Sequence, residues 1–117
     1  MRPRVLIVDD HAGFRAVART LLESDGFDVV GEAVDGAGAI RAVAELTPGI
    51  VLLDVHLPDL DGFAVSAELA ARPSPPAVVL ISSRPIADLR RRVQESPVAG
   101  FLAKDELSGA AVSAVVG

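Results

Sequence analysis

Residues 50–62 read IVLLDVHLPDLDG, and this stretch decides how the rest of the chain is interpreted. Four apolar residues run into an aspartate, Asp54, and a loop containing Pro, Asp and Gly follows. A short, continuously apolar run that ends in turn residues is typical of a strand covered on both faces of a sheet. An unpartnered buried carboxylate is costly, so this position indicates that Asp54 is paired, binds a metal or reacts.

Similar runs recur along the chain, and segments with helical periodicity lie between them. The predicted strands are 4–9, 28–33, 50–54, 77–82 and 99–103, and the predicted helices are 12–24, 36–46, 63–72, 86–95 and 106–116. Alternating strands and helices predict an α/β fold with a parallel sheet. Right-handed crossovers leave few topologies, and we expect the commonest five-stranded one, a flavodoxin-like (βα)5 doubly wound sheet with strand order 2-1-3-4-5.

Length and composition narrow the class of protein. The chain has 117 residues, of which half are hydrophobic, so we expect one domain over 1–117 with a substantial core. It contains no cysteine, which excludes disulfides and thiolate metal sites. No apolar run approaches a membrane span or a signal peptide, so we expect a cytoplasmic protein. The net charge of −5 argues against direct nucleic-acid binding by this segment.

Polar residues close the predicted strands at a single edge of the sheet. Asp9 and Asp10 follow the first strand, Asp54 ends the third, Ser82 ends the fourth, and Lys104 follows the fifth. Lys104 is the only lysine, since the other ten of the 11 basic residues are arginines. The carboxyl ends of parallel strands share one edge, where ligands bind in this class of fold. We therefore expect these side chains to form one pocket.

The chemistry of such a pocket follows from its charges. Clustered carboxylates repel one another, and a hard divalent cation such as Mg²⁺ relieves the repulsion through oxygen ligands. A carboxylate can also act as a nucleophile and form an acyl phosphate. A metal ion and a lysine would neutralise the charge of a phosphoryl group in transfer.

These motifs together resemble the receiver domain of bacterial two-component response regulators over essentially the whole chain. The residues that carry the resemblance are VLIVDD at 5–10, VLLDVHLPDLDG at 51–62, VVLIS at 78–82 and GFLAKD at 100–105. Their spacing is also ordinary for that family, with 44 positions from Asp10 to Asp54, 28 from Asp54 to Ser82 and 22 from Ser82 to Lys104.

The resemblance assigns a role to each matched position. Asp54 would be the phosphoacceptor, and Asp9, Asp10, Asp54 and the backbone carbonyl of His56 would hold Mg²⁺. Ser82, which register favours over Ser83, would hydrogen-bond the phosphoryl group, and Lys104 would pair with it. Phe101 matches the aromatic residue that turns inward as Ser82 moves.

The resemblance also implies partners. A sensor histidine kinase would donate the phosphoryl group, and the domain would catalyse its own phosphorylation and slow dephosphorylation without being a dedicated turnover enzyme. The face formed by residues 86–116 would signal to an output domain or a downstream protein, and a phosphorylation-dependent homodimer is compatible with it. We expect either a stand-alone receiver or a segment from which an output domain has been removed.

Three alternatives use the same residues differently. A receiver-like module could mediate contacts without being phosphorylated. The segment DVHLPD at 54–59 half-matches the loop of cobalamin-binding domains in which a His ligates cobalt, but Asp59 replaces the expected Gly and the motif follows the wrong strand. A phosphatase with an aspartyl nucleophile would need Asp-x-Asp after the first strand, where this chain has adjacent aspartates.

Four local expectations complete the interpretation. The His56 side chain should be exposed at the pocket rim and take no part in catalysis. Asp59 and Asp61 should lie in a turn in which Gly62 adopts a positive φ. Residues 90–92, three arginines, should form a solvated helix face. Gly109 should weaken the last helix.

Overall fold

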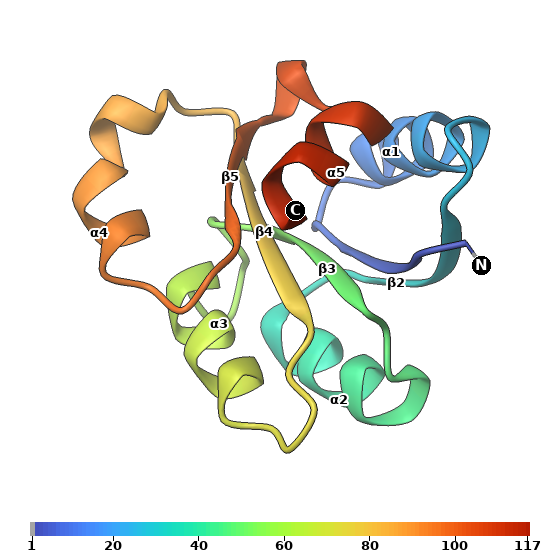
Figure 1. Cartoon of the computed structure of the whole chain (residues 1–117). Helices are drawn as coiled ribbons and strands as arrows, with labels where there is room; N and C mark the ends of the chain where they lie inside the picture. Colours follow the sequence, from blue (N-terminus) through green and yellow to red (C-terminus); the bar gives the residue numbers. More distant parts are fainter. Residues whose placement is uncertain (1) are drawn as a thin grey trace.

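Five parallel strands form one sheet in the order β2-β1-β3-β4-β5 (Figure 1). The structure is a computed structural model and describes residues 2–117. The strands are β1 (Arg4–Val8), β2 (Asp28–Ala33), β3 (Ile50–Asp54), β4 (Ala77–Ser82) and β5 (Gly100–Ala103). The predicted strand order and doubly wound topology are confirmed, and three of the five predicted strands have the predicted bounds.

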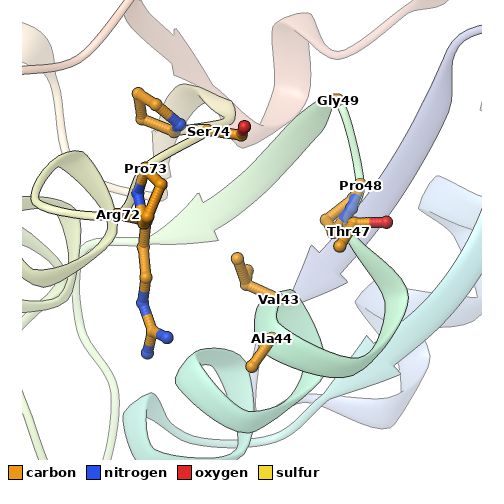
Figure 2. A pocket seen from close by; sticks show the side chains of 9 residues that line it. Val43, Ala44, Thr47, Pro48, Gly49, Arg72, Pro73 and Ser74 are labelled. Atoms are coloured by element: carbon orange, nitrogen blue, oxygen red, sulfur yellow. The ribbon is translucent and has the colours of Figure 1, made fainter.

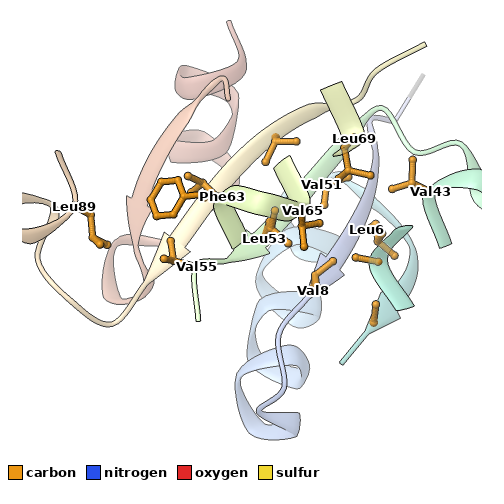
Figure 3. Packing of buried hydrophobic residues seen from close by; sticks show 14 residues of the cluster. Leu6, Val8, Val43, Val51, Leu53, Val55, Phe63, Val65, Leu69 and Leu89 are labelled. Atoms are coloured by element: carbon orange, nitrogen blue, oxygen red, sulfur yellow. The ribbon is translucent and has the colours of Figure 1, made fainter. Parts of the chain in front are cut away.

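Alternating side chains along the central strands fill two separate core layers. On β3, Val51 and Leu53 point into the layer that Figure 3 shows, whereas Ile50 and Leu52 point into the opposite layer. Neighbouring strands repeat the alternation, and all four of these residues are buried. A strand whose two faces are both covered has no position for a charged side chain except at its ends. Charged side chains on the central strands are therefore confined to the strand ends.

Helices cover both faces of the sheet. On one side, α1 (Ala12–Ser24) and α5 (Gly109–Val116) contribute Ala18, Leu22 and Val112 to the core. On the other side, α2 (Gly36–Leu46) and α3 (Gly62–Ala70) supply most of the packing, and α4 (Arg90–Gln94) lies beside them (Figure 1). None of the helices within residues 2–117 has the length and apolar character needed to cross a bilayer.

Polar side chains set where the helices begin. Asp35 accepts a hydrogen bond from Gly38 N at the start of α2, and Ser108 accepts one from Ala111 N at the start of α5. Such caps satisfy backbone N–H groups that have no partner within the helix. A more distant carboxylate, that of Asp25 after α1, also accepts from Gly109 N at 2.7 Å. A Cβ at Gly109 would collide with Asp25, so this glycine permits the close approach of α1 and α5.

Two predicted helices differ from the structure. The predicted helix 86–95 is divided into a 3-10 turn, η1 (Ile86–Asp88), and the five-residue α4, because Leu89 turns inward with a non-helical φ of −123° and ψ of −4°. The predicted helix 106–116 starts later, since the 3-10 turn η2 (Lys104–Glu106) comes first and Ser108 caps α5. Apolar periodicity located both segments but did not reveal these breaks.

The end of α2 carries local backbone strain. Thr47, its C-cap, has φ 46° and ψ 56°, in the left-handed region. This conformation is unfavourable for an L-residue and most of all for a β-branched one. The Thr47 carbonyl accepts a hydrogen bond from the Arg4 guanidinium at 2.9 Å, which holds the turn against β1.

Replacing Thr47 by Gly should therefore stabilise the fold. The gain from removing the strain exceeds the added entropy of Gly in the unfolded chain, and we expect up to about 1 kcal/mol in urea unfolding. Thr20→Gly, at an exposed position inside α1, is the matched control and should destabilise because Gly disfavours helix. A lower stability for Thr47→Gly than for the parent protein would contradict the strain at this turn.

Candidate functional site

Acidic side chains from β1 and β3 meet at the carboxyl edge of the sheet. Asp9 follows β1 directly and is fully buried, and Asp54 is the last residue of β3 and only 3% exposed. Asp10 and His11 come next in the chain after Asp9. One ligand atom from each of these four residues lies within 4.8 Å of the others. The predicted convergence of the first and third strands is therefore present.

Lys104 reaches this cluster from the end of β5. Its Nζ lies 2.6 Å from Asp9 Oδ2 and 3.4 Å from Asp54 Oδ2. The same ammonium lies 4.7 Å from the centre of the Phe14 ring, which covers it from α1. Although burial alone would lower the pKa of Lys104, its contacts with Asp9 and Asp54 raise it. The only lysine is thus a charged partner shared by two buried carboxylates.

Asp54 is held in an environment that opposes its ionisation. Burial raises the pKa of Asp54 above its usual value, and the neighbouring charge of Asp9 adds to the effect. The backbone N–H of His56, which donates to Asp54 Oδ1 at 3.1 Å, and the Lys104 ammonium act in the opposite direction. One oxygen of Asp54 faces the loop and the other faces the lysine.

Arg15 on α1 supports the backbone of the acidic turn. Its guanidinium donates to the Asp9 carbonyl at 2.7 Å and to Glu32 on β2 at 3.0 Å. Arg19, one turn further along α1, donates to the second oxygen of Glu32 at 2.8 Å. These contacts join α1 to β2 beside Asp9. The direction in which the two aspartates point is thereby restricted.

The donor set fits a divalent cation. Asp9 Oδ2 is buried and accepts no well-directed hydrogen bond within the described part of the chain, although the Lys104 ammonium is close. Three carboxylates and one ammonium leave two formal negative charges without compensation. Carboxylate oxygens are the ligands that Mg²⁺ prefers in proteins. The geometry and the charge therefore suit a hard dication.

Ser82, Phe101 and His56 are the remaining site residues that the sequence predicted. Ser82 is fully buried at the end of β4, and its Oγ accepts from Arg84 N at 3.0 Å. Phe101 is half-buried on β5 and packs against the core layer of α2 and α3. The His56 side chain is exposed, as expected. The roles of Ser82, Phe101 and the His56 carbonyl in binding or switching stay predictions.

Sequence reasoning missed two residues of the site. His11 Nδ1 lies 3.1 Å from both Asp9 Oδ1 and Asp10 Oδ1, and Arg15 contacts the Asp9 carbonyl. A signal for His11 was present, because a His beside two aspartates is a common metal-binding pattern. For Arg15 there was none, since an arginine on an amphipathic helix usually contacts solvent.

The loop after β3 corrects the prediction for Gly62, whereas the predicted exposure of residues 90–92 is present in the structure. Gly62 does not have a positive φ; a Cβ there would lie 2.5 Å from the Asp54 carbonyl oxygen and 2.8 Å from Val55 Cα. This glycine therefore allows α3 to pack against the backbone of the acidic residue. Arg92 is not simply solvated, because it pairs with Asp61 at 2.6 Å and lies 4.2 Å from the centre of the Phe63 ring.

Asp59 and Asp61 act as helix caps rather than as plain turn residues. Asp61 accepts from Phe63 N and Ala64 N at the start of α3. Asp59 accepts from Gly36 N at 2.7 Å and Ala37 N at 3.0 Å at the start of α2. The loop that carries the acidic site is thus attached to two helices.

A hollow of about 530 Å³ lies at the other edge of the sheet (Figure 2). It is bounded by the end of α2, with Val43 and Thr47, and by the segment before β4, with Arg72 and Pro73. Arg72 is the one charged residue that lines it. It contains no carboxylate or His, so it is not part of the acidic site.

The fold and the site together define a flavodoxin-like α/β domain with an acidic, lysine-containing site where the winding of the sheet reverses. Residues 5–115 match the family model of the response regulator receiver domain, and the chain belongs to that family. The prediction made from the strand-end motifs is confirmed.

Relatives of known name agree with this assignment. The virulence-factor transcription regulator BvgA of Bordetella pertussis is 38% identical over 106 residues, which cover 91% of this chain and 51% of BvgA. The transcriptional regulatory protein NarL of Mycobacterium tuberculosis is 38% identical over 114 residues, covering 97% of this chain and 53% of NarL. The chain therefore spans about half the length of these relatives.

A solved structure shows the same fold. The signal receiver domain of NarL from Mycobacterium tuberculosis superposes with a TM-score of 0.84 at 36% identity, covering 99% of this chain and 98% of that domain. The cobalamin-binding alternative is not favoured, because the match is to receiver domains and His56 follows the third strand, not the first. The aspartyl phosphatase alternative also loses support, because the match is to receiver domains.

The close packing of Gly62 on Asp54 predicts that Gly62→Ala destabilises the protein. The added methyl group meets backbone atoms that cannot move aside, and we expect a loss of about 1–3 kcal/mol in urea unfolding. Gly13→Ala in α1 is the control, because a Cβ there has nothing within 4 Å and should be neutral or stabilising. Equal stability of Gly62→Ala and the parent protein would show that this contact is not tight.

The pKa directions of Asp54 and Asp59 predict opposite effects of two Asp→Asn changes. The raised pKa of Asp54 means that ionisation destabilises the fold as pH rises above the usual Asp range, so Asp54→Asn should raise the unfolding temperature at neutral pH. Hydrogen bonds from Gly36 N and Ala37 N lower the pKa of Asp59, which means that the ionised carboxylate stabilises the fold. Asp59→Asn should therefore lower the unfolding temperature at neutral pH.

The Asp54→Asn difference should shrink as pH falls toward the ordinary Asp pKa of 3.8, because Asp54 then becomes protonated in the folded state. The Asp59→Asn difference should persist down to that pH and shrink only below it, because the lowered pKa keeps Asp59 ionised in the folded state. The measurement is thermal unfolding in a chelating buffer from pH 7 to about pH 2.5. Two shifts of the same sign at neutral pH would contradict the assignment.

Proposed function

We propose that this domain is a phosphorylation switch in which Asp54 accepts a phosphoryl group in a Mg²⁺-dependent reaction. The observation that carries the proposal is that buried Asp54 and Asp9, exposed Asp10 and the only lysine meet at one edge of the sheet. The domain extends over residues 1–117 in this proposal. The sheet buries both faces of β3, so the end of that strand is where a nucleophile can be reached.

The Mg²⁺ would be held by the carboxylates of Asp9, Asp10 and Asp54 and by the His56 backbone carbonyl. Bound there, it would neutralise phosphoryl oxygens during transfer. Asp9 supports this assignment because it is buried beside Asp54, and its Oδ2 contacts the Lys104 ammonium, a cation, at 2.6 Å. Arg15, which holds the Asp9 carbonyl, would keep the carboxylate directed toward the site.

The donor would be the phosphohistidine of a sensor histidine kinase. An oxygen of the ionised Asp54 forms the new P–O bond while the P–N bond to the donor imidazole breaks, and the nitrogen that leaves takes up a proton. Lys104 faces Asp54 Oδ2 and would pair with the incoming phosphoryl oxygens. Water would later cleave the acyl phosphate slowly, so the domain catalyses its own phosphorylation and dephosphorylation.

The switch would follow from the added charge. Phosphorylation brings about −1.5 to −2 charges to the end of β3. Lys104, which contacts Asp9 more closely than Asp54, would be drawn toward the phosphoryl group. Ser82 is buried at the end of the adjacent strand and would donate its hydroxyl, and Phe101 would then turn inward. The face formed by residues 86–116 would change with them.

The wider partners are inferred from the relatives. BvgA and NarL are transcription regulators about twice as long as this chain, which supports an output domain or a downstream protein as the receiver of the signal. A phosphorylation-dependent homodimer is compatible with such a system. The acidic net charge favours a domain that does not itself bind nucleic acid, working in the cytoplasm.

Phosphorylation of Asp54 can be tested with a small phosphodonor, such as acetyl phosphate, in the presence of Mg²⁺. Intact-mass spectrometry should show a gain of one phosphoryl group in the parent protein and none in Asp54→Asn or in the presence of a chelator. Asp28→Asn is the matched control, because Asp28 is exposed at the opposite edge of the sheet, and it should be phosphorylated normally.

Other outcomes would change the proposal. A mass gain that persists in Asp54→Asn would move the acceptor to another residue. A complete lack of phosphorylation, with Mg²⁺ and donor both present, would favour the interaction module that works without phosphorylation.

A further inference from the structure

The hollow between α2 and the segment that precedes β4 is a concave site separate from the acidic cluster (Figure 2). Its volume of about 530 Å³ is in the range of pockets that hold small ligands. Gly49, which lines it, immediately precedes β3, whereas Asp54 ends that strand. The two sites therefore lie at opposite ends of one strand, and the function proposed above uses no residue of the hollow.

The walls of the hollow are mostly apolar and are held in place by the backbone. The apolar side chains that line it are Val43, Ala44, Pro48, Pro73 and Pro75. Each proline ring fixes one backbone φ. The two walls are also joined, because the N–H of the first residue of β4 donates to the carbonyl of the residue before β3 at 2.9 Å. A ligand that enters meets a preformed surface and requires little ordering of the chain.

Arg72 gives this apolar hollow its positive charge. The side chain is half-buried, and its guanidinium makes no hydrogen bond or ion pair with residues 2–117. Glu68, four residues earlier, is exposed and is not paired with it. Figure 2 shows the Arg72 side chain extending along the hollow on the side that faces Val43 and Ala44. A guanidinium matches the geometry of a carboxylate, to which it can donate two parallel N–H bonds.

The turn at the rim of the hollow keeps an unfavourable conformation. Thr47 has φ 46° and ψ 56°, and Arg4 holds its carbonyl from the neighbouring strand. Strained non-glycine residues persist where the surrounding structure fixes them, and they are concentrated at ligand sites. This turn brings the chain from α2 into β3 and so places Pro48 and Gly49 in the wall.

We propose that this hollow binds a small amphipathic carboxylate. The apolar body of the ligand lies between α2 and the prolines, and its carboxylate accepts hydrogen bonds from the Arg72 guanidinium. The apolar walls exclude a simple inorganic anion as the preferred ligand, because such an anion would leave them exposed to water. The single positive charge favours one anionic group. The inference goes beyond the proposed function and does not depend on it.

The test is an amide NMR titration of the full chain with 3-phenylpropionate, and with 3-phenylpropionamide as the neutral analogue. The carboxylate should shift the backbone N–H signals of Val43, Thr47 and Gly49 and the side-chain N–H signal of Arg72. The N–H of His56, which donates to Asp54 at the other edge, is the internal reference and should not shift. The carboxylate should bind about tenfold more tightly than the amide, because charge-assisted hydrogen bonds are the stronger ones.

Substitutions around the hollow give the second measurement. In Arg72→Gln the two probes should bind with equal affinity, because the apolar walls remain and the charge is lost. Arg41→Gln is the matched control, since Arg41 is exposed on α2 and does not line the hollow, and it should keep the preference for the carboxylate. Ala44→Phe places a ring in the hollow from an exposed helix position and should weaken binding of both probes.

Four outcomes would overturn the inference. They are a lack of binding at millimolar 3-phenylpropionate, equal affinity of the parent protein for the two probes, shifts confined to the acidic edge, and displacement of the probe by equimolar inorganic phosphate. The comparison of the two probes uses the parent protein, so it decides the question even if Arg72→Gln folds poorly. Each of these failures leaves the proposed phosphorylation of Asp54 untouched, because no residue is shared.

Discussion

The carboxylates of Asp54 and Asp9 are buried together, and a single ammonium, that of Lys104, stands between them. Two like charges removed from water cost several kcal/mol each unless an opposite charge or a cation compensates them. The lysine compensates only in part, because three carboxylates meet at this point. The remaining negative charge is of the kind that a dication would neutralise, and a further negative charge on Asp54 would add to it.

The parallel sheet is what creates this arrangement. Its central strands are apolar on both faces, so the carboxyl edge is where a polar side chain can extend from a strand without being buried in hydrocarbon. The reversal of winding between β1 and β3 leaves that edge uncovered by a crossover. Asp9 and Asp54 occupy equivalent positions on neighbouring strands, and the length of β5 brings Lys104 to the same level.

Much of this could be predicted from the sequence, because apolar runs and strand-end polar residues carry strong local signals. Asp9, Asp54 and Lys104 were found in that way, and the strand order followed from the handedness of crossovers. The breaks around α4 and the contact of Gly62 with Asp54 were not predicted, because they depend on residues distant in sequence. Arg92 shows the same limit: its neighbours Arg90 and Arg91 look identical in sequence, and the positions of Asp61 and Phe63 distinguish it.

Contacts of the acidic site extend to the 86–116 face along two paths. One is Lys104 itself, which joins both buried carboxylates to the end of β5 and the start of η2. The other is the loop after β3, where Gly62 packs on the Asp54 backbone and Asp61, its neighbour, pairs with Arg92 of α4. The first path responds to charge and the second to the position of the backbone. Because α4 has only five residues and no buried side chain, its placement depends on such contacts, and the Arg92–Asp61 pair joins it to the loop that follows Asp54.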